Sequence, residues 1–216
     1  SHARTPSVAA RAAPARPYAT TEEREACADF NPLRTAFYGD LHVHTAYSQD
    51  ASTQGTRNTP REAYRFARGE ALGIQPYVGG LPLRRMQLRR PLDFAAVTDH
   101  AELLGEVHTC ITPGLPGHDS LPCKIYRTWP RISYFMMNMK SSMRNPTRFA
   151  FCGVKGERCL EAALTPWTET QAAAEAAYDR SATCEFTTFV AYEWTGSIDT
   201  NNLHRNVIFR NERVPQ

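Results

Sequence analysis

Residues 37–50 read FYGDLHVHTAYSQD, and this stretch decides most about the chain. His42 and His44 stand two residues apart in a short apolar run, so on a strand both side chains point to the same side. Imidazole is the commonest metal ligand in proteins, and the end of a rigid strand holds it well. Asp40 and Asp50 flank the pair and add carboxylates that either bind a metal or orient the histidines. The stretch predicts a metal site; two exposed histidines on a half-buried strand are the alternative.

Three more candidate ligand positions lie at the ends of predicted strands. The apolar run LDFAAVT at 92–98 is typical of a strand buried on both faces, and it ends in Asp99 and His100. Glu193 and His204 belong to two later strands. Mixed histidine and carboxylate ligands suit Zn²⁺, Mn²⁺ or Fe²⁺ better than Mg²⁺ or Ca²⁺. A bridging carboxylate such as Glu193 would allow a two-metal centre, which activates water and stabilises charge in phosphoryl transfer.

The remaining patterns predict an α/β fold with a parallel sheet. Thr59, Pro60 and Glu62 form a capping box with proline at the first helical position, which predicts a helix reaching about residue 71. The other expected elements are a short polar helix at 21–28, strands at 36–44, 92–98, 186–194 and 204–209, a hairpin at 74–91, and a helix at 165–180. Residues 105–165, rich in proline, are expected to be an irregular insertion that is helical only at 124–142.

Length and charge limit the possible functions. The chain has 216 residues, 42% of them hydrophobic, and a net charge of only +3, so we expect neither a nucleic-acid partner nor binding to an anionic membrane. No apolar run approaches the roughly 20 residues of a membrane-spanning helix. Residues 1–35 are expected to be a disordered or extended lead, and residues 36–216 to form the folded domain.

The six cysteines include no C-x-x-C pair, which argues against a zinc ribbon or a thioredoxin-like motif. Two pairs are close in the sequence, Cys110 with Cys123 and Cys152 with Cys159. Disulfides at these pairs would suit an exported or periplasmic protein. Free buried thiols in a cytosolic protein are the alternative.

Four segments together resemble a known family. Residues 39–45 (GDLHVHT) and 97–100 (VTDH) look like the first two motifs of the PHP (polymerase and histidinol phosphatase) superfamily, and the closest match within it is the DUF3604 family. Residues 189–196 (FVAYEWTG) resemble the third motif, whose glutamate is a metal ligand. Residues 203–209 (LHRNVIF) resemble the strand that follows, which starts with a ligand histidine.

The resemblance implies part of a distorted, TIM-like (β/α)7 barrel that holds two or three divalent metals (Zn, Mn or Fe) and hydrolyses phosphoesters. His42 and His44 would then bind one metal, with Asp50 taking the place of the next ligand. His100 would bind a neighbouring metal, Glu193 would bridge, and His204 would complete the set. The catalytic group would be Asp99, His100 and Glu193, with Asp40 and Asp99 orienting the histidines.

The superfamily supplies later ligands that do not follow His204 here, so we expect a domain truncated at its C-terminus. An open barrel edge would invite self-association. The expected partner is a small phosphorylated substrate, and the arginines at 84–90 are either a solvated edge or a phosphate-binding rim. A metal-dependent amide or ester hydrolase on the same barrel is one alternative. An inactive fragment or binding module is the other.

Overall fold

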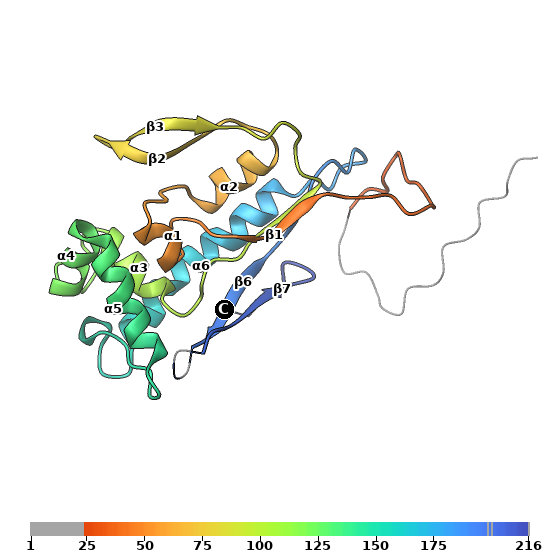
Figure 1. The fold of residues 1–216 in the computed structure, drawn as a ribbon. Helices are drawn as coiled ribbons and strands as arrows, with labels where there is room; N and C mark the ends of the chain where they lie inside the picture. The colour runs from red at the N-terminus through yellow and green to blue at the C-terminus, as the bar shows by residue number, and fades with distance from the viewer. Residues whose placement is uncertain (1–23, 198, 200, 216) are drawn as a thin grey trace, which may run out of the picture.

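The structure is a computed structural model that describes residues 24–197, 199 and 201–215 (Figure 1). The strands are β1 (Gly39–Val43), β2 (Leu72–Val78), β3 (Leu81–Met86), β4 (Phe94–Val97), β5 (Thr187–Phe189), β6 (Ala191–Gly196) and β7 (Leu203–Ile208). The helices are α1 (Gln49–Thr53), α2 (Pro60–Ala67), α3 (Leu104–Ile111), α4 (Leu121–Thr128), α5 (Pro130–Ser142) and α6 (Glu157–Ala177), with a 3₁₀ turn at Ala150–Cys152. No helix in these ranges is both long and apolar enough to cross a membrane.

The central sheet has the order β1-β4-β5, and both of its pairings are parallel, as the sequence predicts. The predicted strand at 186–194 is interrupted at Val190, so that β5 and β6 follow one another along the same edge. Backbone bonds of 3.1 Å from Glu193 N to Asp99 O, and from Ala101 N to Glu193 O, continue the contact beyond β4. The metal-ligand candidates on β1, after β4 and on β6 therefore lie at one end of neighbouring parallel strands.

Strand β7 lies outside the parallel sheet, because it pairs with β6 in the antiparallel sense. The short connection after β6 permits only a hairpin, since a parallel return needs a crossover of a dozen or more residues. Asn206 of β7 also donates a hydrogen bond of 2.7 Å to the carbonyl of Leu41 on β1. The described strands pair as three small sheets, and the seven-stranded barrel stays a prediction.

Helix α2 begins as predicted and ends early. The Thr59 backbone N–H donates to Glu62 Oε2 at 2.7 Å, and the Glu62 N–H donates to the Thr59 hydroxyl, which is the predicted capping box. The helix stops at Ala67 rather than near residue 71, because Gly69 adopts φ +90°, a left-handed conformation that commonly ends helices. The hairpin predicted at 74–91 forms from β2 and β3.

The segment at 105–165 is mostly helical, which corrects the expectation of an irregular insertion. Two of its prolines start helices rather than break them: Pro122 lies in the first turn of α4, and Pro130 is the first residue of α5. Helix α6 begins at Glu157, so Pro166 lies inside it and does not open it. Helix α3 approaches α6 so closely at Gly105 that a Cβ there would collide with the carbonyl of Cys159.

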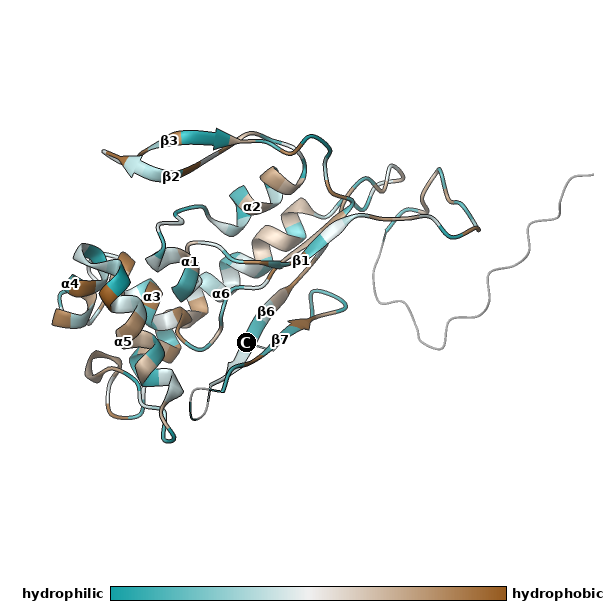
Figure 2. Cartoon of the chain, in the orientation of Figure 1, coloured by the Kyte–Doolittle hydropathy of each residue, from teal (hydrophilic) through white to brown (hydrophobic). Residues whose placement is uncertain are grey.

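Two hydrophobic cores hold these layers together. The first lies among the helices α3–α6, and its buried members include Val107, Tyr126 and Met137. The second lies between the central sheet and helices α2 and α6, around Tyr64 and Phe186. Figure 2 shows that α4 and α5 each carry both hydrophobic and hydrophilic residues, as expected of helices that pack on a core with one side only. The helical segment is therefore a packed layer beside the sheet (Figure 1).

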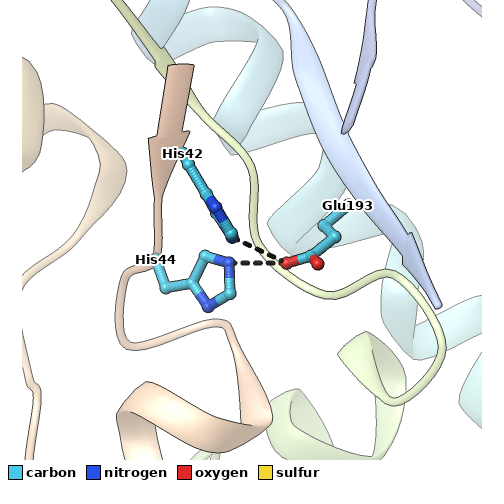
Figure 3. A group of neighbouring side chains, drawn as sticks. All are labelled: His42, His44 and Glu193. Atoms are coloured by element: carbon cyan, nitrogen blue, oxygen red, sulfur yellow. Dashed lines mark hydrogen bonds and ion pairs between the residues drawn. The ribbon is translucent and has the colours of Figure 1, made fainter. Parts of the chain in front are cut away.

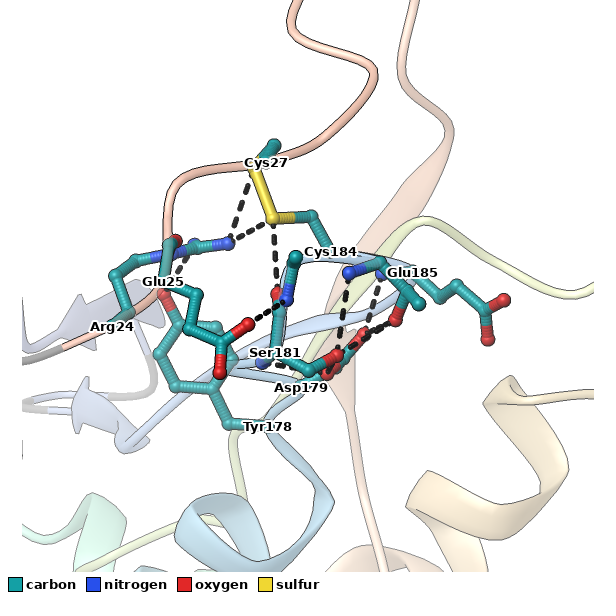
Figure 4. Close-up of a disulfide and its surroundings, with 10 residues drawn as sticks. Arg24, Glu25, Cys27, Tyr178, Asp179, Ser181, Cys184 and Glu185 are labelled. Atoms are coloured by element: carbon teal, nitrogen blue, oxygen red, sulfur yellow. Dashed lines mark hydrogen bonds between the residues drawn. A yellow bond between two sulfur atoms is a disulfide. The ribbon is translucent and has the colours of Figure 1, made fainter.

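All six cysteines form disulfides. The two predicted pairs, Cys110–Cys123 and Cys152–Cys159, are confirmed and buried in the helical core. The third, Cys27–Cys184, joins residues 157 positions apart and was missed because distant cysteines carry no pairing signal in the sequence (Figure 4).

Most of the predicted lead lies outside the described residues. Its described part, 24–35, contains no helix, so the helix predicted at 21–28 is wrong where it can be seen. This part is fastened to the loop after α6 by the Cys27–Cys184 disulfide and by a backbone bond of 2.9 Å from Ala28 N to Ala182 O.

Candidate metal centre

Glu193 is the centre of a cluster of histidines. Its side chain is only 1% exposed, and its Oε2 lies 2.8 Å from His44 Nε2 and 3.2 Å from His42 Nε2 (Figure 3). The same oxygen lies 3.7 Å from His100 Nε2, while Oε1 lies 2.6 Å from His204 Nδ1. The strand positions predicted to carry ligands therefore converge on one carboxylate.

Strand geometry explains this convergence. His42 lies on β1 and His44 just beyond its end, so the i, i+2 alternation aims both rings at β6. His100 follows β4 and forms a parallel bridge with Glu193. His204 is near the start of its strand, and it reaches the same place only because β7 runs antiparallel to β6.

Asp50 touches the cluster through His44. Both of its oxygens lie 3.0 Å from His44 Nδ1, and its Oδ1 accepts a bond of 2.6 Å from the Ser48 hydroxyl. The opposite nitrogen of the same ring, Nε2, faces Glu193. A carboxylate that holds the far nitrogen of a ligand histidine fixes the orientation of its ring. Asp50 is thus placed to orient His44, and it also lies 3.9 Å from His100 Nε2.

Thr195 and Glu102 complete the surroundings of His100. The Thr195 hydroxyl lies 3.0 Å from Nδ1 of His100 and 3.0 Å from Nδ1 of His204. Glu102 accepts a bond of 2.6 Å from the Thr195 backbone N–H and lies 3.7 Å from His100 Nδ1. Sequence reasoning missed both residues, although Thr195 stands two positions after Glu193 on the same face of the strand.

The two acids beside the histidines, Asp99 and Asp40, accept hydrogen bonds from the backbone. Asp99 is buried and accepts bonds from the Thr45 N–H and the Thr45 hydroxyl, the latter at 2.6 Å. Burial raises the pKa of Asp99 to about 6. Asp40 accepts a bond of 2.9 Å from the His42 N–H. Asp99 therefore holds the chain directly after His44, and both acids bond to backbone or hydroxyl groups rather than to a histidine ring.

Charge at the cluster favours ionised carboxylates and protonated rings. Burial alone would raise the pKa of Glu193, but the neighbouring His100 and His44 outweigh it and leave the pKa lowered. For Asp50, hydrogen bonds from His44 and Ser48 outweigh burial in the same way and bring its pKa well below the usual range. Burial would lower the pKa of His44 and of His100, yet the nearby carboxylates raise both.

The donor set fits divalent metal ions. His42, His44 and Glu193 form one group whose potential ligand atoms lie within 4.8 Å of one another; His44, Asp50 and His100 form a second, and His100, Glu193 and His204 a third. His44 Nε2 and Glu193 Oε1 are buried atoms without a hydrogen-bond partner of proper geometry. Their neighbours are close but poorly aligned, as expected of atoms directed at a shared ion. A group of Glu106, Cys152 and Cys159 does not fit, because its cysteines form a disulfide.

The arginines predicted as a solvated edge or a phosphate rim lie on or beside the β2–β3 hairpin. Arg84 donates to the carbonyl of Gln75 at 3.0 Å, and Arg85 donates to that of Ala71 at 3.2 Å. Arg90 forms an ion pair with Asp93 at 3.1 Å. In Figure 1 helix α2 lies between the hairpin and strands β6 and β7. These contacts favour the solvated edge.

The fold and the site together define a mixed α/β protein with a histidine–carboxylate cluster at one end of its strands. A family model described as a protein of unknown function, DUF3604, matches residues 31–216. The chain therefore belongs to the DUF3604 family. No curated protein and no solved structure matches it.

Proposed function

We propose that this domain is a metal-dependent hydrolase of phosphoesters of the PHP type, with two or three divalent ions held by the cluster. The single observation that carries the proposal is the convergence of four histidines on the buried carboxylate of Glu193. A buried carboxylate surrounded by imidazoles supports a metal site, because burying a charged group without a counter-charge costs free energy and a divalent ion would supply that charge.

The position of each residue indicates its role in the proposed centre. His42, His44 and Glu193 would hold one ion; His100, Glu193 and His204 would hold a second, so Glu193 would bridge. Bound ions of this kind lower the pKa of water and polarise a phosphoryl oxygen. Asp50 orients His44 and Thr195 orients His100, each from the ring nitrogen that faces away from Glu193, and Asp99 holds the turn after His44. We assign Asp99 a positioning role in place of the catalytic one implied by the resemblance.

The alternative reaction is hydrolysis of an amide or ester on the same ligands. We favour the phosphoester over the amide or ester because of the sequence motifs, since the same metal ligands could serve both reactions. A binding module without activity is the third possibility, and it predicts metal uptake without turnover.

The disulfides indicate the cellular compartment in which the protein acts. Three disulfides in one domain are typical of an oxidising environment. We propose that the protein acts outside the cytoplasm, in the periplasm or beyond.

The test is hydrolysis by the purified protein after loading with Zn²⁺, Mn²⁺ or Fe²⁺. An aryl phosphate, an aryl ester and an aryl amide are compared, with Glu193→Gln as the inactive variant and His108→Ala as the control outside the cluster. We expect the phosphate to be cleaved in a metal-dependent way and Glu193→Gln to lose at least a hundredfold in rate. Cleavage of the ester or amide alone, or equal rates for Glu193→Gln and the native chain, would refute the proposal.

A further inference from the structure

A polar cavity of about 170 Å³ lies beside the proposed metal centre. Asp50, His100 and His204 line one part of it, and helix α5 supplies Tyr134, Asn138 and Ser141. The helical segment at 105–165 thus contributes part of the wall next to the ligands. Because one wall carries the proposed ligands, a group held in this cavity would lie directly against the ester to be cleaved.

Away from His100 and His204, the wall offers hydrogen-bond acceptors and no basic side chain. No lysine or arginine is among the described residues that line it. The amide nitrogen of Asn138 already donates to Tyr134 O at 2.8 Å, which leaves its side-chain oxygen as an acceptor. Ser141 donates its hydroxyl proton to the carbonyl of Asn138 at 3.0 Å, so its oxygen also accepts. Glu102 adds a carboxylate to this lining. Away from the proposed metal centre, such a wall favours a ligand that brings several donors, and it gives no counter-charge to a further anionic group.

The size of the cavity limits the ligand further. A cavity of about 150 Å³ accommodates one benzene ring, so about 170 Å³ accommodates a single six-membered ring. A second cavity of about 330 Å³ shares Glu102, Leu103, Ser141, Thr195 and Ser197 with the first. A substituent on the ring can therefore continue away from the centre.

We propose that this cavity binds the alcohol portion of the substrate as a hydroxyl-bearing six-membered ring, a monosaccharide or cyclic polyol. Hydroxyl groups supply the donors that Asn138, Ser141 and Glu102 require, and each well-placed bond of this kind contributes about 1 kcal/mol. The ester to be cleaved would face His100 and His204. This inference rests on the proposed function, because it identifies the alcohol that is released when the phosphoester is hydrolysed.

The first experiment measures binding without turnover. The melting temperature of the metal-loaded protein is recorded with and without a saturating cyclic polyol such as inositol, for the native chain, Asn138→Leu and Met139→Ala. Asn138→Leu fills the cavity and removes the acceptor, whereas Met139 lies on the same helix and is 60% exposed. We expect the polyol to raise the melting temperature of the native chain and of Met139→Ala only. An equal rise in Asn138→Leu, or no rise in any chain, would overturn the inference.

The second experiment separates this inference from the proposed function. Rates are compared for hexose monophosphates, an aryl phosphate, a nucleoside diphosphate and a phosphorylated amino alcohol. We expect kcat/KM for a hexose monophosphate to exceed that for the diphosphate at least tenfold, and we expect Asn138→Leu to lower it about tenfold while Met139→Ala leaves it unchanged. Preference for the diphosphate or the amine would overturn the ring assignment alone. Failure to cleave any phosphate refutes the proposed function. The binding experiment then still tests whether the cavity binds a hydroxyl-bearing six-membered ring.

Discussion

Thr195 and His204 face each other across the β6–β7 hairpin, with 3.0 Å between the threonine hydroxyl and Nδ1 of the imidazole. The same hydroxyl lies 3.0 Å from Nδ1 of His100. A hydroxyl has one proton, so it can donate to only one of these rings, and at least one ring must donate to it if both bonds form. Thr195 therefore makes the proton positions of the two histidines depend on one another.

This relationship predicts different outcomes for two substitutions. Thr195→Val keeps the shape and removes the hydroxyl, so we expect metal affinity to fall about 10- to 100-fold, as is usual when the partner of a ligand histidine is lost. Thr195→Ser keeps the hydroxyl and should bind metal nearly as the native chain does. Competition with a chelating dye measures both affinities. Equal affinity for Thr195→Val and the native chain would show that the hydroxyl has no such role.

Asp50 provides a test of how His44 is held. Because both carboxylate oxygens lie 3.0 Å from Nδ1 and the other ring nitrogen faces Glu193, we treat Asp50 as an orienting group for His44. Asp50→Asn should therefore retain its metal with affinity about 10-fold to 100-fold lower. His44→Ala should lose the ion altogether. If Asp50→Asn releases as much metal as His44→Ala, Asp50 is itself an indispensable ligand.

The Cys27–Cys184 disulfide is predicted to be reduced before the other two. Both of its cysteines are partly exposed, whereas the other four are buried in the helical core. Mild dithiol treatment followed by alkylation and mass spectrometry should label Cys27 and Cys184 first. The bond closes a loop spanning 157 positions, so a double serine variant should lose up to about 5 kcal/mol of unfolding free energy on the chain-entropy model. Earlier labelling of the buried cysteines would contradict this order.

The buried ion pair of Glu106 and Arg148 gives the stability a pH dependence. The Arg148 guanidinium contacts the two carboxylate oxygens at 2.7 and 2.8 Å, but burial dominates and raises the pKa of Glu106 above its ordinary 4.5. The folded state then binds the proton of the Glu106 carboxyl more tightly than the unfolded chain does. Its contribution to stability is fully present below pH 4.5 and is lost as the pH rises through the folded pKa.

We therefore expect the native chain to lose unfolding free energy relative to Glu106→Gln as the pH rises from about 4 to about 8. Urea denaturation at several pH values measures the difference, in which the other titrating groups largely cancel. Arg148→Met serves as the matched variant, and it should cost roughly 3–5 kcal/mol at neutral pH because it leaves a buried charge alone. A difference between the native chain and Glu106→Gln that does not change with pH would contradict the assigned shift.

Local signals in the sequence predicted much of the fold and the site. The i, i+2 spacing of His42 and His44 predicted their common direction, and the capping box placed the start of α2. The two short-range disulfides were predicted because the cysteines are close in the sequence. In each case the information lies within a few neighbouring residues.

Features that depend on long-range packing were not predicted. The helices between 105 and 165 form around a core that joins α3 to α6. Pro122 and Pro130 suggest helix breaks in the sequence, although in the structure both lie at helix starts. Helix α6 tolerates Pro166 within it while its first half packs against α3. The contact of Thr195 with two histidines depends on the register between β6 and β7, which places Thr195 opposite His204 and which the sequence pattern did not reveal.

The central claim is that Glu193 and its histidines hold metal, and metal content measured by mass spectrometry after loading and dialysis tests it most directly. The native chain, His42→Ala/His44→Ala, Glu193→Gln and His108→Ala are compared, each checked for folding by circular dichroism. We predict about two to three equivalents of Zn²⁺, Mn²⁺ or Fe²⁺ in the native chain and in His108→Ala, and less than a tenth of that in the two cluster variants. Equal metal in all four folded proteins would contradict the account.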